Sequence, residues 1–175
     1  MRPVSRDLAS RIREAALLEG DFVLSCGERS SFYVDKYLFS TEPELLRGVA
    51  EALSERLPGG VERLAGVELG AVPLVVATAL VTGLPYVIVR KFAKEYGTGR
   101  GIEGNLEHGE RVALIEDVVT TGTQAVQAAR TLTKAEAEVV TIVAVLDRRE
   151  ATGERLEEFP FRALLKIDDL RVSSK

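Results

Sequence analysis

One stretch of thirteen residues, Arg111–Thr123, constrains the fold of this chain more than any other. It opens with an uncharged apolar run rich in β-branched residues, which predicts a buried strand. Glu116 and Asp117 follow at the expected end of that strand, and Thr120–Thr123 form a hydroxyl-rich turn before a helix-like run. A strand that passes through a glycine-containing turn into a helix presents free backbone N–H groups and the positive end of the helix dipole. The stretch therefore predicts a phosphate-binding site.

The two adjacent carboxylates restrict the kind of ligand that fits beside this turn. Like charges repel, so a bare polyphosphate is disfavoured next to Glu116 and Asp117. Hydroxyl groups and a bound Mg²⁺ are both compatible with carboxylates, and a ribose 5-phosphate carries hydroxyls next to its phosphate. For this stretch alone, an ordinary strand-to-helix turn with a threonine N-cap and solvated acids is the alternative.

Composition indicates one folded, soluble domain spanning residues 1–175. The chain is 46% hydrophobic and 29% charged, and its formal net charge of −4 argues against a nucleic-acid partner. The only cysteine, Cys26, rules out an intramolecular disulfide and favours a reducing compartment. Cys26 and the only histidine, His108, are too few for a zinc site of the usual kind.

Neither a signal peptide nor a membrane segment is expected, which predicts a cytoplasmic location. The N-terminus has no apolar segment of the kind a signal peptide requires. Residues 71–89 carry no charge over nineteen positions, close to the length that spans a bilayer. However, Pro73, Gly83 and Pro85 divide them, so a short helix, a turn and a buried strand explain them better.

Apolar periodicity predicts a doubly wound α/β fold with a mostly parallel sheet. Gly20 is expected to end the first helix, and Thr41 with Glu44 forms a capping box for the second. The first two strands are expected to form a separate hairpin. The expected helices span residues 5–18, 41–57, 72–81 and 124–132, and the expected strands span 22–25, 31–35, 64–67, 86–90, 112–115 and 138–146.

The connection Arg90–Gly104 is rich in cations and glycines. Four cations and four glycines share these fifteen residues between two expected strands. Connections in α/β units usually have about 2–6 residues, so a longer one is either functional or disordered. Beside a phosphate site, a cationic glycine-rich segment is typical of a lid that closes over a polyanion and excludes water. A solvated surface loop is the alternative.

These segments resemble known enzymes. The stretch Arg111–Thr123 resembles the signature of type I phosphoribosyltransferases, and the cationic connection resembles the catalytic loop of orotate phosphoribosyltransferases. In that loop Arg90, Lys91, Lys94 and Gly97 match as they stand, while Tyr96 replaces the usual histidine. The resemblance spans roughly residues 20–149 and is closest to the short, archaeal-like orotate enzymes.

Two other segments resemble the same family but lack an expected lysine. Residues 20–40 resemble the family's hood, a β-hairpin that covers the base, and Ser25 stands where the hood tends to carry a lysine. Gly70 stands where the pyrophosphate loop often has another. Arg29 or Lys36 could supply the missing phosphate contact, and the sequence does not decide between them.

The resemblance implies transfer of the 5-phosphoribosyl group from phosphoribosyl pyrophosphate to orotate, with Mg²⁺, in pyrimidine (UMP) biosynthesis. Mg²⁺ would be held mainly by the substrate, with water linking it to Glu116 or Asp117. It also implies a homodimer in which residues 91–104, part of a catalytic loop spanning 91–109, act on the neighbouring site. A purine or other base phosphoribosyltransferase, and a phosphoribosyl pyrophosphate-sensing regulator of the same fold, are the alternatives.

The same resemblance assigns roles to individual residues. The implied catalytic residues are Lys91, Lys94 and Asp117. Contacts to phosphoribosyl pyrophosphate are expected from Arg90, Lys91, Lys94, Tyr96, Glu116, Asp117, Val118, Val119, Thr120, Thr121, Gly122 and Thr123, and contacts to orotate from Thr120, Arg148 and Tyr33.

Overall fold

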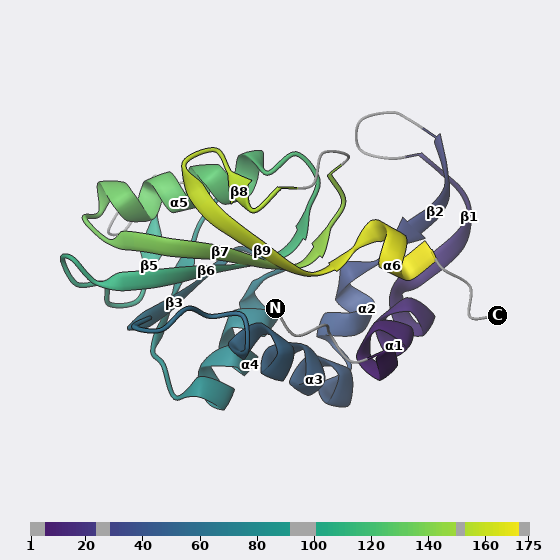
Figure 1. The fold of residues 1–175 in the computed structure, drawn as a ribbon, viewed down its shortest axis with the longest axis horizontal. Helices are drawn as coiled ribbons and strands as arrows, with labels where there is room; N and C mark the ends of the chain where they lie inside the picture. Colours follow the sequence, from purple (N-terminus) through teal and green to yellow (C-terminus); the bar gives the residue numbers. More distant parts are fainter. Residues whose placement is uncertain (1–5, 24–28, 92–100, 150–152, 172–175) are drawn as a thin grey trace.

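The structure is a computed structural model that describes residues 6–23, 29–91, 101–149 and 153–171. The described residues form a seven-stranded sheet with helices on both faces, and a two-stranded hairpin projects from one end (Figure 1). The strands of the main sheet lie in the order β5-β4-β3-β6-β7-β9-β8. Their bounds are β3 Arg63–Val67, β4 Tyr86–Val89, β5 Ile102–Glu103, β6 Arg111–Val119, β7 Glu138–Asp147, β8 Arg155–Leu156 and β9 Phe159–Lys166.

The sheet is mostly parallel, as the alternation of strands and helices predicts. Strands β4, β3, β6, β7 and β9 pair in parallel, and only the short edge strands β5 and β8 pair antiparallel. Neither edge strand was expected from the sequence, nor was β9, which continues the parallel sheet beyond β7. The doubly wound α/β fold is confirmed.

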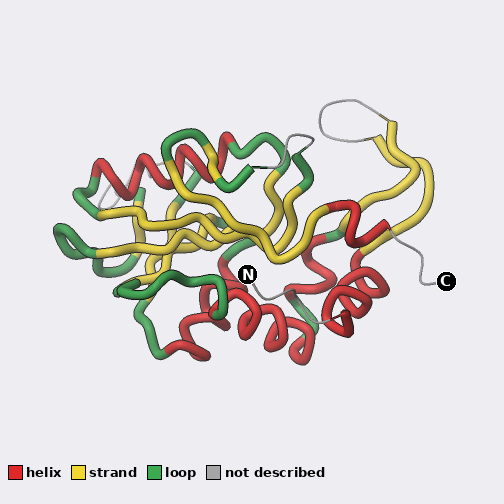
Figure 2. Tube along the Cα trace, viewed as in Figure 1, coloured by secondary structure: helices red, strands yellow, loops and turns green. Residues whose placement is uncertain are grey.

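Two apolar layers hold the helices against the sheet. On one face lie α1 Arg6–Ala16, α3 Pro43–Ser54 and α4 Val72–Thr82, and on the other lies α5 Thr123–Lys134 (Figure 2). Helices α1, α3 and α5 each bury an apolar stripe, as amphipathic spacing requires, whereas α4 is largely apolar on all sides. In α3, for example, that stripe consists of Leu45, Val49, Ala50 and Leu53. The remaining helices are short: α2 Lys36–Ser40 and α6 Ile167–Arg171.

The N-terminal hairpin consists of β1 Leu17–Val23 and β2 Arg29–Val34. Two expectations about its start were wrong, because α1 ends at Ala16 and Gly20 lies within β1. Leu17 pairs with Val34 and Leu18 with Tyr33, so strand pairing rather than a glycine ends the helix. The predicted hairpin itself is confirmed.

The expected capping box at Thr41 was also wrong. A short helix that the sequence did not reveal, α2, ends just before it, and Thr41 Oγ1 donates to the carbonyl of Tyr37 at 2.6 Å. Glu42 is the N-cap of α3 instead, and its carboxylate accepts from the backbone N–H of Leu45 at 2.6 Å. Thr41 therefore closes one helix, and its neighbour opens the next.

The uncharged segment 71–89 folds as the sequence predicts. It divides into α4, a turn at Gly83 with φ of 74°, and β4. No helix within the described ranges combines the length and apolar character that crossing a bilayer requires.

Candidate active site

The two carboxylates of the signature lie on the section of β6 that no longer pairs with β3. Parallel pairing of β6 with β3 ends at Ile115, whereas pairing with β7 continues to Val119. The strand was expected to end before Glu116, and this was wrong because β6 continues to Val119 along β7. The expected end is correct only for the pairing with β3. Beyond Ile115 the backbone of β6 pairs only with β7, and the turn after β3 runs beside Asp117, since a Cβ on Gly70 would lie 1.7 Å from Asp117 Oδ2.

Asp117 is held by two groups from different parts of the chain. Its Oδ1 accepts from the backbone N–H of Val118 at 2.5 Å, and its Oδ2 lies 2.7 Å from Nζ of Lys36, the first residue of α2. Asp117 is 3% exposed. Burial lowers the pKa of the Lys36 ammonium, but the hydrogen bond and charge of Asp117 outweigh it, so this pKa is raised.

Glu116, unlike Asp117, has no cation paired with it among the described residues. It is 6% exposed, and within the described part of the chain its Oε2 has no hydrogen-bond partner. Burial, followed by the negative charge of Asp117, raises the pKa of Glu116 well above its usual range. A buried oxygen without a partner is costly unless a ligand satisfies it, so this carboxyl is placed for binding rather than for stability.

The turn after β6 has the geometry expected of a phosphate cradle. Gly122 precedes α5 with φ of 85°, and no side chain caps the helix. A Cβ at this position would lie 2.6 Å from Leu156 Cδ2, so only glycine fits. Thr121 and Thr123 exchange a hydroxyl hydrogen bond of 3.0 Å. Gly122, not a threonine, occupies the N-cap position, while Thr121 Oγ1 accepts from the backbone N–H of Thr123 at 3.3 Å. A helix N-terminus with a glycine cap favours an anion.

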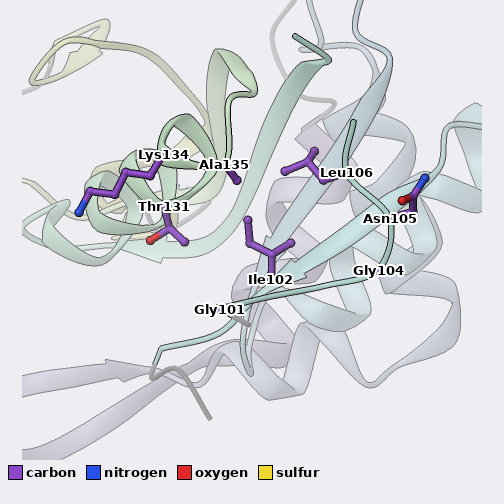
Figure 3. Close-up of a pocket in the computed structure, with 8 residues that line it drawn as sticks. All are labelled: Gly101, Ile102, Gly104, Asn105, Leu106, Thr131, Lys134 and Ala135. Atoms are coloured by element: carbon purple, nitrogen blue, oxygen red, sulfur yellow. The ribbon is translucent and has the colours of Figure 1, made fainter. Parts of the chain in front are cut away.

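Two cavities lie near these elements, and only one contains the signature. A small one of about 70 Å³ is lined by Glu116, 118–122, Gln124 and Ala125. Gln124 was not singled out from the sequence. A larger one of about 420 Å³ lies elsewhere, between Ile102 and Leu106 on one side and α5 on the other (Figure 3). Because its lining holds neither carboxylate nor the phosphate turn, we place the active site at the smaller cavity.

The base of the cationic loop is fixed to the turn after β3. Glu68 accepts from the backbone N–H of Lys91 at 2.7 Å, and its second oxygen lies 3.8 Å from the Arg90 guanidinium. Arg90 also approaches Glu103 at 3.5 Å. Glu68 therefore contacts Arg90 and Lys91 at the base of the loop. Lys94 and Tyr96 lie outside the described residues.

Of the two arginines after β7, Arg149 makes side-chain contacts that hold the fold together within the described residues. Arg149 pairs with Asp147 at 2.8 Å, and it donates to the carbonyls of Gly153 and Arg155. The backbone N–H of Arg148 bonds Val119 at 2.8 Å, which sets it beside the start of the phosphate turn. The orotate role of Arg148 stays a prediction.

In the hood, Tyr33 lies beside Phe22, with ring centroids 5.7 Å apart, and Arg29 pairs with Asp21. Ser25 lies outside the described residues. Arg29 is thus engaged within the hairpin, whereas Lys36 lies at the active site. The orotate role of Tyr33 stays a prediction.

Comparisons with known proteins decide the family. Residues 41–168 match the family described as the phosphoribosyl transferase domain. The orotate phosphoribosyltransferase of Natronomonas pharaonis is 48% identical over 169 residues, covering 95% of this chain and 96% of that protein. This chain belongs to the orotate phosphoribosyltransferase family.

Other members agree over the same length. The orotate phosphoribosyltransferase of Haloquadratum walsbyi is 45% identical over 176 residues, covering 99% of this chain and 96% of that protein. The crystal structure of the orotate phosphoribosyltransferase from Aeropyrum pernix superposes with a TM-score of 0.82 at 30% identity, covering 93% of this chain and 95% of that one. The family resemblance read from the sequence is therefore confirmed.

The residues of this orotate phosphoribosyltransferase fit a metal that the substrate brings with it. Among the described residues, no three histidine, cysteine or acidic side chains form a metal cluster. Asp117 is occupied by Lys36 and Val118, which leaves the unpartnered Oε2 of Glu116 as the free acceptor. Mg²⁺ keeps several waters and is usually bound by one or two carboxylates plus substrate phosphates, and this donor set suits that arrangement.

Proposed function

We propose that this chain transfers the 5-phosphoribosyl group from phosphoribosyl pyrophosphate to N1 of orotate, giving orotidine 5′-monophosphate and pyrophosphate. The observation that carries the proposal is the carboxyl end of β6, where two buried carboxylates adjoin the N-terminus of α5 with glycine as its N-cap. One ligand must satisfy both features, and a phosphorylated ribose does so. Its 5′-phosphate takes the N–H groups of the turn, and its hydroxyls take the carboxylates.

Each signature residue then has a role that follows from its position. Thr120, Thr121, Gly122 and Thr123 bind the 5′-phosphate, since backbone N–H groups at a helix N-terminus favour an anion. Glu116 and Asp117 hold the ribose hydroxyls, so that C1 is fixed relative to the base. Arg148 binds the orotate carboxylate, because a planar guanidinium matches a planar carboxylate.

Departure of pyrophosphate is the step in which the enzyme must stabilise the most developing charge. As the bond between C1 and pyrophosphate breaks, positive charge develops on the ribose and negative charge on the leaving group. Lys91 and Lys94 neutralise the leaving group, and a closed loop over them excludes water and strengthens each charge interaction. Mg²⁺, held mainly by the substrate and through water by Glu116 or Asp117, supplies further charge neutralisation.

We also propose that the enzyme is a homodimer whose catalytic loop, 91–104, acts on the neighbouring active site. Apolar side chains are exposed around α4 and β4, including Leu80 at 82%, with Val81 and Tyr86 beside it in the chain. Exposed apolar residues gathered on one element are typical of an interface. A second copy covering α4 would bring its own loop, which begins after β4, close to the joint interface.

The direct test is loss of orotate absorbance when phosphoribosyl pyrophosphate and Mg²⁺ are added. We expect orotate to be consumed with an equivalent release of pyrophosphate, and adenine or hypoxanthine not to replace it. Transfer to a purine with no transfer to orotate would refute the proposal.

Mixed dimers test the action of the loop across the interface. A Lys94→Ala variant and an Asp117→Asn variant are each expected to be nearly inactive. Mixing them should restore activity, because a mixed dimer contains one site with an intact Asp117 and an intact incoming Lys94. Subunit exchange is verified by tag capture, and inactivity of captured mixed dimers would show that the loop acts within its own chain.

A further inference from the structure

A lysine that the signature does not contain is paired with one of its carboxylates. Lys36 follows the hood, and its Nζ is 2.7 Å from Asp117 Oδ2. The Lys36 side chain is 35% exposed, whereas that of Asp117 is 4% exposed. The ammonium therefore lies between a buried carboxylate and solvent, where an incoming ligand meets it first.

The surroundings of this ammonium favour an anion. The turn after β3 lies against it, since a Cβ on Gly70 would be 3.0 Å from Lys36 Nζ. That turn leads directly into α4, whose first N–H groups are already used or absent: Val72 donates to the carbonyl of Leu69, and Pro73 has no N–H. Glu68, the acidic residue of the same turn, bonds the backbone of Lys91 and so points its charge elsewhere. The positive charge beside the Gly70 turn therefore comes from the Lys36 ammonium.

The turn at Gly70 packs closely on the Lys36–Asp117 pair. A Cβ at this position would lie 1.7 Å from Asp117 Oδ2, which is far inside van der Waals contact. Any side chain at residue 70, a lysine included, is therefore incompatible with the Lys36–Asp117 pair as it stands. A side chain from the turn after β3 would have to displace this pair, whereas Lys36 on α2 already places a positive charge here.

We propose that Lys36 is a substrate-binding residue that holds the pyrophosphate group of phosphoribosyl pyrophosphate, in place of the lysines absent at Ser25 and Gly70. This rests on the proposed function, because it takes the ribose to lie at Glu116 and Asp117. In the free enzyme Lys36 is paired with Asp117. When the ribose hydroxyls engage Asp117, the ammonium turns to the pyrophosphate oxygens beside it. Arg29, the other candidate, is paired with Asp21 in the hairpin.

Binding of the two halves of the substrate tests this directly. Inorganic pyrophosphate with Mg²⁺ and ribose 5-phosphate are titrated separately by calorimetry into the wild-type enzyme and into Lys36→Met, which keeps the length of the side chain. We expect pyrophosphate affinity to fall at least about tenfold and ribose 5-phosphate affinity to change less than about threefold. Lys36→Arg, which retains the charge, should lose less pyrophosphate affinity than Lys36→Met. Arg29→Ala is the matched control and should bind both ligands as the wild type does.

The two affinities separate this role from a structural one. If Lys36 only held Asp117 in place, ribose 5-phosphate binding would fall at least as much as pyrophosphate binding, and the proposal would be overturned. Unchanged pyrophosphate affinity in folded Lys36→Met would overturn it as well. Loss of pyrophosphate affinity in an enzyme that consumes no orotate would support the role of Lys36 while refuting the proposed function.

Chemical labelling of the wild-type enzyme covers the case in which Lys36→Met does not fold. Acetylation of lysines by acetic anhydride is followed residue by residue with mass spectrometry. We expect pyrophosphate with Mg²⁺ to slow acetylation of Lys36 at least about fivefold, and ribose 5-phosphate not to slow it. Equal acetylation of Lys36 with and without pyrophosphate would overturn the proposal.

Discussion

The two ends of β6 carry glutamates in contrasting surroundings. Just before its amino end, Glu110 accepts from the Arg63 side chain at 2.6 Å and from the backbone of Glu107 at 3.1 Å. Near its carboxyl end, Glu116 has an oxygen without a partner among the described residues. The hydrogen bond from Arg63 lowers the pKa of Glu110, whereas burial and then Asp117 raise the pKa of Glu116.

This difference separates stability from function along a single strand. At the amino end each charge meets a partner within the fold, which favours the folded state. At the carboxyl end the fold holds two adjacent carboxylates, of which Asp117 is paired with Lys36 and Glu116 has an oxygen without a partner among the described residues. Functional sites commonly retain such unfavourable groups at some cost in stability. Substitutions at the two ends should therefore affect different measurements.

The largest effect is expected at the amino end, on stability alone. Arg63→Ala leaves Glu110 without its charged partner in a nearly buried position, so the free energy of unfolding should fall by about 2–3 kcal/mol. The melting temperature should fall by roughly 5–10 °C. Orotate transfer at 25 °C should stay close to the wild-type rate. The control is Arg11→Ala, whose exposed pair with Glu44 spans 3.7 Å and should contribute under about 1 kcal/mol. Loss of activity without loss of stability would contradict the comparison.

At the carboxyl end, Asp117→Asn should reduce activity and preserve the fold. We expect kcat/KM for phosphoribosyl pyrophosphate to fall at least about tenfold, a loss of about 1.4 kcal/mol or more in transition-state binding. The amide keeps the shape of the side chain but loses the charge that faces Lys36. Asp168→Asn, on an exposed aspartate that pairs with Arg171, is the matched control. Wild-type kinetics in folded Asp117→Asn would refute the proposal that this carboxylate holds the ribose hydroxyls.

Arg148 and Arg149 allow the same comparison, between binding and stability, to be made at two adjacent residues. Arg148→Ala should raise the KM for orotate by about tenfold, or about 1.4 kcal/mol, and change that for phosphoribosyl pyrophosphate less than about threefold. Arg149→Ala should instead lower the melting temperature, because it removes the partner of buried Asp147. An equal rise in both KM values for Arg148→Ala would identify a structural arginine.

The smallest effect is expected in the pH dependence of stability. Because the folded-state pKa of Glu116 is raised, this residue's contribution destabilises the fold progressively as the pH rises from its unfolded value through its folded value. Glu116→Gln should remove that decline and gain about 1 kcal/mol or less at neutral pH.

Glu110→Gln is the opposite control for that experiment. The folded-state pKa of Glu110 is lowered, so its contribution is present above the unfolded value and is lost as the pH falls through the folded value. Chemical denaturation between pH 3 and pH 8 measures both variants. Parallel curves for the two variants would show that the glutamates do not differ in this way.

The sequence predicted the framework well because local patterns encode it. Apolar periodicity located the central strands and their helices, and the order of acids, hydroxyls and glycine located the phosphate turn. Boundaries failed where pairing between distant segments decided them. Leu17 and Leu18 continue a helical pattern, yet they pair with Val34 and Tyr33 in the hairpin.

The contents of the site were less accessible than its location. Asp117 was identified from its neighbours in sequence, but its partner Lys36 lies on another element, and no local pattern links the two. Arg29 and Lys36 looked equivalent because both are cations near the hood. Only the folded chain shows that the first pairs with Asp21 and the second with Asp117. The partnerless oxygen of Glu116 is likewise a property of packing that composition does not reveal.

Gly122 has a consequence for how this enzyme can diversify. Its φ of 85° disfavours every side chain, and Leu156 independently excludes a Cβ. Shortening Leu156 would relieve the second obstacle and leave the first, so no single compensating change reopens the position. Leu156 belongs to β8, a two-residue edge strand far along the chain from the turn. Variation in that outlying strand is therefore coupled to the phosphate turn: a substitution at residue 122 would require Leu156 to shift and would still carry the strain of a positive φ.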